Sequence, residues 1–244
     1  MPIKAGDVFL TKEGCKLIVV SFKNSSKILI EFLDKNKHQL TVRSDYLKKC
    51  NIKNPFHPSV YGFGMYGSGI YKSTAFGKRT PAYETWKHML CRCYNADYLE
   101  KNPTYNFCSV CPEWLNFQSF AEWFEKEPSS GKLGFNLDKD LRKVGNKIYS
   151  PSTCSFVPYQ INSLLTDHGL ARGLLPQGVN AVGRMFGAQI RVNGKLLYLG
   201  KYVTPDLAFQ AYRKAKEANV KLMAEEWKEY LHSEVYSNLA SWKL

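Results

Sequence analysis

The sequence predicts a modular α+β protein: a small N-terminal β-barrel, a central strand–loop–strand–helix unit, and a C-terminal three-stranded sheet with one helix. Three observations support this prediction. Residues 1–53 alternate apolar and polar positions between turn signals, as short strands do. Residues 135–169 read as strand, loop, strand and helix. Residues 178–223 contain the hairpin signal Asn193-Gly194 and then an amphipathic helix.

The net charge of the chain is +13, from 34 Lys and Arg against 21 Asp and Glu. The basic excess lies at the two ends: residues 1–70 carry 11 basic and 5 acidic groups, and residues 171–244 carry 11 and 6. Such an excess attracts polyanions, and the many interleaved aromatic residues favour nucleic acid over an anionic membrane. The alternative is a merely soluble basic protein.

The chain has no run of eighteen apolar residues, and its start, MPIKAGDVFL, lacks the features of a secretory signal. We therefore expect an intracellular protein with no membrane partner. Seven cysteines, an odd number, fit reduced thiols or a metal site better than a disulfide framework. The sequence does not give the oligomeric state, and a monomer is the default expectation.

The first 53 residues predict four or five short strands that curl into a barrel similar to Tudor-like barrels. Their turn signals include Glu13-Gly14 and Asn24-Ser25-Ser26. A structural role and a role in contacting the DNA backbone both remain open for this barrel. Residues 54–79 form a linker rich in glycine and aromatic residues, which we expect to be ordered and to pack its tyrosines on a neighbouring element.

Four helices are predicted outside the central unit's own helix. One begins at Thr80-Pro81 and continues to about Met89, and a second covers 112–127 with aromatic residues spaced by three and four. A third begins with Thr204 as its cap and Pro205 in its first turn. A tail helix is expected over roughly residues 225–239.

The middle of the chain resembles phage-encoded HNH-type endonucleases, many of which are related to homing enzymes. The recurrent landmarks of that group stand here in order over about eighty residues: Trp86, Met89, Arg92-Cys93-Tyr94, Val110-Cys111, Glu113-Trp114, Leu137-Asp138-Lys139, Tyr149-Ser150-Pro151 and Cys154. The resemblance implies a ββα-metal fold in which a hairpin and a helix hold one divalent ion, Mg²⁺ or Mn²⁺. It also implies the cytoplasm of an infected bacterium as the location.

The resemblance assigns roles to four residues. Asp138 takes the place of a metal ligand, Asn162 in the following helix is the second ligand candidate, and Asp140 is an auxiliary carboxylate. Lys139 stands where the family has the histidine that deprotonates water. A lysine is protonated at neutral pH, so this replacement predicts a slow enzyme, in which Lys139 clamps the phosphate as a cation, or an inactive one.

Simpler interpretations remain open for these positions. Asp138 is also suited to a turn or a salt bridge, and Asn162 to a hydrogen bond within its helix. Asn146, after Gly145, fits a turn residue better than a ligand. His168 is the only histidine close behind the motif, and an exposed position at a helix end is its simplest role.

Two close cysteine pairs, Cys91 with Cys93 and Cys108 with Cys111, have a spacing compatible with a structural zinc site. The alternative is that the landmark cysteines Cys93, Cys111 and Cys154 are buried small hydrophobic residues. The sequence leaves both interpretations open.

The last segment resembles the Apetala or ethylene-response-factor type of DNA-binding domain, through Gly178-Val179, the run 186–202 and the run 204–215. That resemblance implies a three-stranded sheet in the major groove of DNA. Arginine is the best bidentate reader of guanine, whereas lysine mainly contacts phosphate. By position the DNA-contacting candidates are Arg184, Gln189, Arg191, Lys195, Tyr198 and Lys201.

These features divide the chain into a β-barrel (1–53), a linker (54–79), an HNH-like nuclease domain (80–170) and a DNA-binding domain with a C-terminal helix (171–244). The favoured interpretation is a metal-dependent endonuclease that cleaves or nicks double-stranded DNA. The main alternative is a catalytically decayed relative that binds DNA as a regulator. An RNA-binding protein or ribonuclease is a third, less favoured interpretation.

Overall fold

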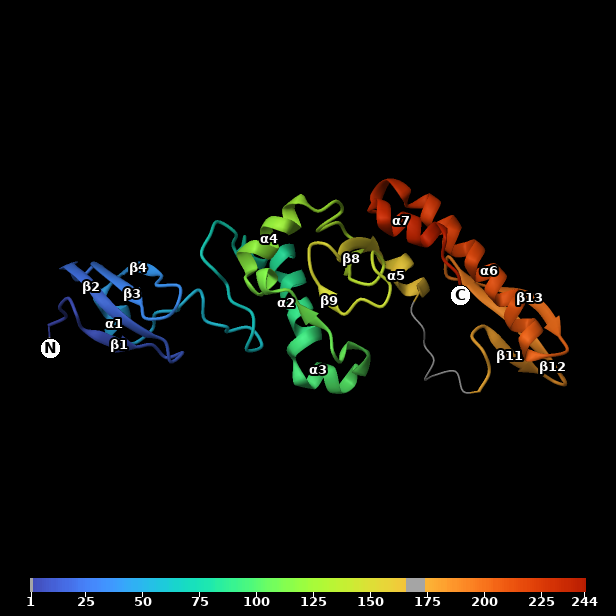
Figure 1. Ribbon diagram of the computed structural model, residues 1–244, viewed down its shortest axis with the longest axis horizontal. Coiled ribbons are helices and arrows are strands. Elements are labelled where there is room, and N and C mark those ends of the chain that lie inside the picture. Colours follow the sequence, from blue (N-terminus) through green and yellow to red (C-terminus); the bar gives the residue numbers. More distant parts are fainter. Residues whose placement is uncertain (1, 166–173) are drawn as a thin grey trace. The chain divides into compact units, whose positions relative to one another are not determined.

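A computed structural model describes residues 2–165 and 174–244 of the chain (Figure 1). The chain divides into two compact units, Met1–Glu125 and Lys126–Leu244. The range predicted for the nuclease domain, 80–170, is thus shared between both units. The chain contains both helices and strands, as the sequence predicted.

The first unit begins with an antiparallel sheet whose strands lie in the order of the sequence: β1 (Val8–Leu10), β2 (Lys16–Asn24), β3 (Lys27–Phe32) and β4 (Gln39–Val42). In this sheet β1 and β4 do not pair, so the predicted barrel is not closed. Four strands, two of them this short, are too few to enclose a core. Leu47 of α1 (Ser44–Lys48) and Ile52 complete the apolar cluster instead.

The segment predicted as an ordered linker packs closely, as expected. The side chain of Gln118 donates to the carbonyls of Tyr66 (3.3 Å) and Tyr71 (3.0 Å) and accepts from the Tyr71 N–H (3.0 Å). The Tyr66 ring stacks on Phe117, with centroids 5.4 Å apart. The segment ends in a two-stranded ribbon of β5 (Thr74–Ala75) and β6 (Lys78–Arg79).

The helices that follow show one difference from the prediction. Helix α2 (Pro81–Tyr94) begins as expected, because Thr80 Oγ1 accepts the N–H of Tyr83 at 3.3 Å. The helix predicted over 112–127 is instead a 3-10 turn and then α4. Asn116 interrupts it with an extended backbone, and its Oδ1 accepts the N–H of Gln118 at 2.9 Å. The elements of this region are α3 (Ala96–Lys101), η1 (Pro103–Tyr105), β7 (Ser109–Val110), η2 (Pro112–Leu115) and α4 (Phe117–Lys126).

The second unit opens with the predicted strand–loop–strand–helix arrangement. Strands β8 (Phe135–Asp138) and β10 (Ser155–Pro158) are antiparallel, with Asp138 opposite Ser155. Helix α5 (Tyr159–Leu165) follows β10 directly, and β9 (Ile148–Tyr149) lies in the long loop between the two strands. This confirms the order of elements expected from the sequence.

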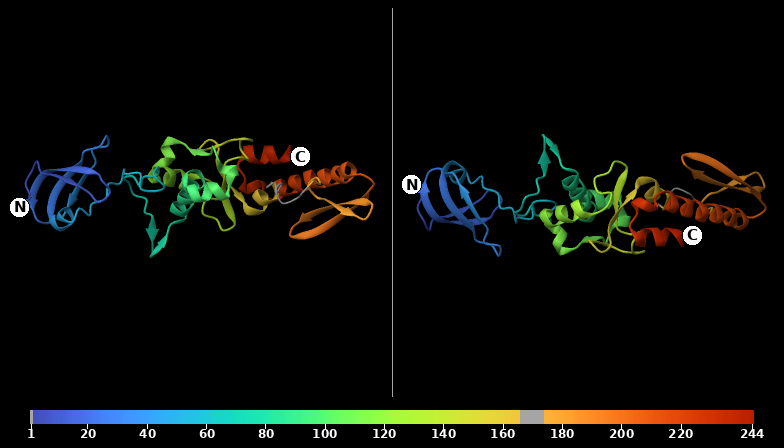
Figure 2. Two further views of the ribbon diagram at one scale, coloured as in Figure 1. Left: turned by 90° about the horizontal axis from the view of Figure 1, so that it is seen from below. Right: turned by 90° about the horizontal axis from the view of Figure 1, so that it is seen from above.

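The C-terminal part is a three-stranded antiparallel sheet and a long helix, as predicted. The strands are β11 (Val179–Val182), β12 (Met185–Val192) and β13 (Lys195–Tyr202). Asn193 and Gly194 turn with φ of 48° and 77°, the left-handed pair that a tight hairpin needs. Helix α6 (Pro205–Glu226) begins with Thr204 Oγ1 accepting the Leu207 N–H at 3.3 Å. Figure 2 shows this sheet beside α6 in two further views.

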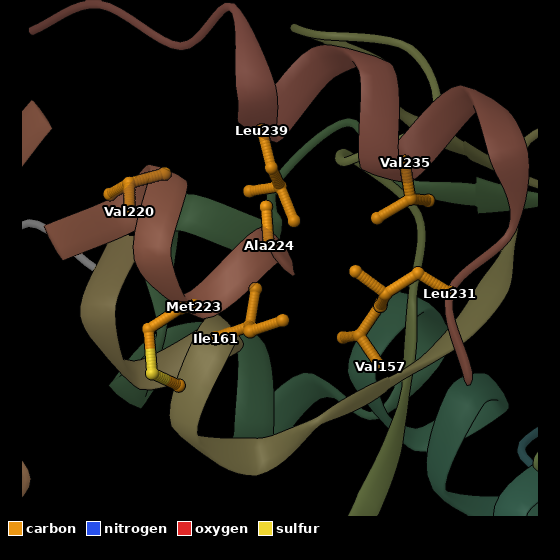
Figure 3. Close-up of a cluster of buried hydrophobic side chains, with 8 residues drawn as sticks. All are labelled: Val157, Ile161, Val220, Met223, Ala224, Leu231, Val235 and Leu239. Carbon is orange, nitrogen blue, oxygen red and sulfur yellow. The ribbon is translucent and has the colours of Figure 1, made fainter. Parts of the chain in front are cut away.

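The tail forms a separate short helix. After α6 come a 3-10 turn, η4 (Lys228–Tyr230), and α7 (Ser233–Ala240). Eight buried side chains join this tail and the end of α6 to the strand–loop–strand–helix unit (Figure 3): Val157, Ile161, Val220, Met223, Ala224, Leu231, Val235 and Leu239. The two parts of the second unit therefore share one hydrophobic core.

Candidate functional site

Asp138 fastens the start of the loop that follows β8. Its Oδ1 accepts the backbone N–H groups of Asp140 (2.8 Å) and Leu141 (2.7 Å). Burial raises the pKa of the Asp138 carboxyl, and the two hydrogen bonds oppose that rise. The turn role that the sequence left open for Asp138 is thus present in the structure.

Lys139 points into the same loop and is bound there. Its side chain is only 8% exposed, and its Nζ lies 2.7 Å from both carboxylate oxygens of Asp140 and 3.2 Å from the carbonyl oxygen of Asn146. These three contacts use the protons of an ammonium group, which has no lone pair with which to accept a proton from water. In this arrangement the Lys139 side chain stabilises the loop. It is not positioned to act as a general base or to bind a phosphate group.

Asn146 also holds the loop together. Its Nδ2 donates to the carbonyls of Lys139 (2.8 Å) and Ile148 (2.7 Å), and its Oδ1 accepts the Ile148 N–H (3.2 Å). The preceding Gly145 has a φ of 74°, which suits glycine. The interpretation of Asn146 as a turn residue is confirmed.

Of the oxygen donors that the resemblance assigned to a divalent ion, one is already engaged within the loop. The Asp140 carboxylate is taken up by Lys139, which leaves Asp138 and the half-buried Asn162 of α5 as candidate ligands. Opposite Asp138, the Oγ of Ser155 is buried without a hydrogen-bond partner. Mg²⁺ is commonly held by one or two protein oxygens, with water and substrate phosphates completing its shell. Asp138 and Asn162 lie on β8 and α5, two elements that contact each other.

The described residues contain no preformed metal-binding site. The part of the chain that the structure describes contains no group of three or more His, Cys, Asp or Glu side chains that could hold a metal ion. His168 lies outside the described residues. The four cysteines considered for zinc therefore do not form a site: Cys91, Cys93, Cys108 and Cys111.

The cysteines of this group differ in their surroundings. Burial raises the pKa of the Cys111 thiol to about 11, whereas zinc binds thiolates. The side chain of Cys91 instead forms a hydrogen bond with Tyr61. This hydrogen bond is the main cause of the rise in the pKa of Tyr61 to about 12. Cys93 and Cys154 are buried, as the alternative interpretation expected, whereas Cys111, the third cysteine of that interpretation, is only partly buried.

The tail helix α7 contacts the loop after Asp138, which the sequence did not indicate. The side-chain amide of Asn238 donates to the carbonyls of Leu141 (2.8 Å) and Arg142 (3.1 Å). Arg142 donates through Nε to Glu234 of α7 at 2.7 Å and through Nη1 to the carbonyl of Cys154 at 3.2 Å. Helix α7 is thereby tied to the start of the loop, and Arg142 links it to the residue before β10.

The second candidate site is the face of the three-stranded sheet opposite Ala188 and Ile190, called the open face here. Three of its residues, Gln189, Arg191 and Leu196, line one cavity with Tyr212, Lys216 and Asn219 of α6. Ala188 and Ile190 are buried on the side that packs on this helix. Cross-strand partners share a face. The alternate residues of β12, with their partners on β13, therefore lie on the open face: Gly187 with Lys201, Gln189 with Tyr198, and Arg191 with Leu196.

A bulge in β13 brings Lys201 to this face. The register shifts between Ala188, which pairs with Gly200, and Gln189, which pairs with Tyr198, so Leu199 has no partner on β12. Without that extra residue, Tyr198 and Lys201 would point to opposite faces, because side chains alternate along a strand. The bulge places both on one face.

The six predicted DNA-contacting residues are therefore not all together. Gln189, Arg191, Tyr198 and Lys201 share the open face. Arg184 is exposed in the turn between β11 and β12, and Lys195 pairs with Val192 on the opposite face, because the strand alternates.

Two residues of the open face were missed by the sequence reasoning. Asn180 pairs with Gly187, and its Oδ1 is buried without a hydrogen-bond partner. Leu196 is 56% exposed beside Arg191. The strand alternation on either side of the Asn193-Gly194 turn was the signal that would have found Leu196.

No protein-family model, curated protein or solved structure matches this chain. None of the described helices has the length and apolar character needed to span a membrane.

Proposed function

We propose that this chain binds double-stranded DNA with the open face of the β11–β13 sheet. The observation that supports this most is the gathering of Arg191, Lys201, Gln189 and Tyr198 on one solvent-facing surface, in a chain of net charge +13. The major groove of B-DNA admits a two-stranded ribbon such as the β12–β13 hairpin. Arginine and glutamine are the side chains that best recognise guanine and adenine, and lysine contacts phosphate.

A second function, metal-dependent nicking of the bound DNA, is favoured by the β8–β10–α5 unit. It has the element order of an HNH-like nuclease, with Asp138 at the end of its first strand and Asn162 in its helix. Those two residues would hold Mg²⁺ or Mn²⁺, and the ion would neutralise charge on the phosphate. Because Lys139 is bound within the loop, the protein contributes no general base at that position, and we expect slow cleavage.

Binding is tested by fluorescence anisotropy of the full chain with a duplex pool, at several salt concentrations. Affinity should fall steeply with salt, with a slope of log affinity against log salt near −0.9 for each phosphate contacted. A matched pool of structured RNA should bind more weakly, and single-stranded RNA should not be preferred. A flat dependence on salt would refute binding to nucleic acid.

Cleavage is tested by incubating supercoiled plasmid with the protein and Mg²⁺ or Mn²⁺. Loss of nicking in both Asp138→Ala and Asn162→Ala, with DNA binding retained, would support the second function. Nicking that survives both substitutions together would place the chemistry elsewhere in the chain. Intact binding without nicking in any divalent metal would identify a decayed nuclease that acts through binding alone.

A further inference from the structure

Leu196 is an apolar side chain at the end of the open face next to the hairpin turn. It is 56% exposed and pairs directly across the hairpin with Arg191, on the face that also carries Gln189 and Tyr198. An exposed leucine on its own is ordinary in a soluble protein. What distinguishes Leu196 is its place as the immediate neighbour of the arginine best suited to recognise a base.

Arg191 is held in a defined orientation beside it. Its Nη1 donates to the carbonyl of Gly194 in the hairpin turn at 2.9 Å. The Nε and Nη2 groups form the other edge of the guanidinium, and two parallel donors of this kind match O6 and N7 of guanine. The turn therefore orients Arg191 while leaving a bidentate edge for a base.

The major groove offers one apolar group, the C5-methyl of thymine, and an aliphatic side chain is a suitable contact for it. Cross-strand neighbours have Cβ atoms about 5 Å apart, against a rise of about 3.4 Å per base pair. Two side chains with this spacing can reach neighbouring base pairs. We propose that Leu196 determines specificity by contacting the methyl group of a thymine next to the guanine that Arg191 recognises. This inference rests on the proposed DNA binding by the sheet.

The chain contains a matched control in the next residue. Leu197 is 47% exposed, close to the value for Leu196, but it pairs with the buried Ile190 and so belongs to the opposite face of the sheet. The same truncation at the two positions removes the same atoms from opposite faces. A difference between the two variants therefore reports the face, and not a general loss of apolar surface.

The test uses the full chain and a duplex selected by it from a random pool. Each thymine of the selected site is replaced singly by deoxyuridine, which removes only the methyl group. For the wild type and Leu197→Ala, we expect one replacement, next to a guanine, to weaken binding about fourfold, equivalent to about 0.8 kcal/mol for one methyl-sized group. Leu196→Ala should bind the thymine and deoxyuridine duplexes equally.

Two results would overturn the inference while leaving DNA binding intact. One is a selected site in which no thymine can be replaced with loss of affinity. The other is methyl dependence that persists in Leu196→Ala or disappears equally in Leu197→Ala. If no variant, including the wild type, binds duplex DNA, the proposed function fails and the role of Leu196 fails with it.

Discussion

The side-chain amide of Asn238 in α7 donates a hydrogen bond of 2.8 Å to the backbone carbonyl of Leu141, three residues beyond Asp138. A residue close to the C-terminus thus holds the loop that carries the candidate metal ligand. The N–H of the same Leu141 donates to Asp138 at 2.7 Å. The position of the Asp138 carboxylate is therefore linked to the docking of α7.

Replacing Asn238 by alanine should loosen the loop between β8 and β10. The change removes two hydrogen bonds to loop carbonyls, and we expect the free energy of unfolding to fall by about 1–3 kcal/mol. Hydrogen exchange should accelerate at the amides of residues 139–154. Ser237→Ala, at an exposed neighbouring position of α7, is the control and should leave exchange unchanged. Equal rates of hydrogen exchange at the loop amides in both variants would contradict this role of Asn238.

The contact between Glu234 and Arg142 should make α7 docking sensitive to acid. The hydrogen bond and the charge of Arg142 hold the pKa of the Glu234 carboxyl below its ordinary value. A lowered pKa in the folded state means that the stabilisation is present above the ordinary pKa of glutamate and is lost as the pH falls through the folded pKa.

Thermal unfolding measured over pH tests this. Glu234→Gln should lower the Tm at pH 7, and the gap between this variant and the wild type should close as the carboxyl becomes protonated in acid. His232 Nδ1 lies 3.7 Å from the same carboxylate, so both proteins are compared in a His232→Gln background. A gap of constant size down to about pH 3 would show that the ion pair does not stabilise the fold.

Lys139 should matter for folding more than for proton transfer. Lys139→Met removes the contacts to Asp140 and to the Asn146 carbonyl, and we expect a loss of about 1.5–3 kcal/mol in the free energy of unfolding. Lys143→Met, at an exposed position of the same loop, should change stability by less than about 0.5 kcal/mol. Urea titration of both variants measures the difference, and similar losses would contradict the bound position of Lys139.

The two faces of the sheet should differ in their effect on DNA affinity. Arg191→Ala should weaken binding to the selected duplex by about 1–3 kcal/mol and relax the preference for guanine at one position. Lys195→Ala removes a positive charge from the same hairpin but on the opposite face, and should cost much less. Anisotropy titrations at one salt concentration compare them. An equal loss in both variants would point to general charge attraction.

We expect the protein to hold no zinc at Cys111, because this partly buried cysteine belongs to no group of potential metal ligands among the described residues and its thiol is protonated at neutral pH. With a pKa of about 11, roughly one thiol in a thousand is ionised at pH 8. Alkylation of Cys111 by iodoacetamide should be slow near neutral pH and accelerate in alkali. Dialysis against a chelator should leave the Tm unchanged. Retention of one equivalent of zinc would overturn this account of the cysteines.

Local patterns in the sequence predicted most elements, because caps and turns act over a few residues. Pro81 in the first turn of α2, Thr204 as the cap of α6 and Asn193-Gly194 as a hairpin turn each have the role expected of them. The prediction that the N-terminal sheet closes into a barrel was wrong. The alternation of apolar and polar residues predicts strands, but it does not show whether the two edge strands pair with each other. Asn116 divides a helix whose apolar spacing alone predicted continuity.

The candidate site was harder to predict, because it depends on contacts distant in the sequence. The resemblance assigned Lys139 by its position in a motif, but the direction of its side chain is set by Asp140 and by Asn146, seven residues further on. The bulge at Leu199 changes which face Lys201 occupies, and strand periodicity alone gives no sign of it. The contacts of Asn238 join residues nearly one hundred positions apart.

The hydrophobic core shared by β10, α5, α6 and α7 limits how this chain could be assembled by gene fusion or shortened by truncation. A gene fusion that joined a nuclease module to a ready-made sheet-and-helix module at about residue 170 would have left apolar surfaces of both modules in water. Deleting residues 178–244 would likewise remove the apolar partners of Val157 and Ile161, and we expect the remaining part of the unit to lose stability. Lys126–Leu244 is therefore expected to fold as one cooperative unit and not as two independent modules.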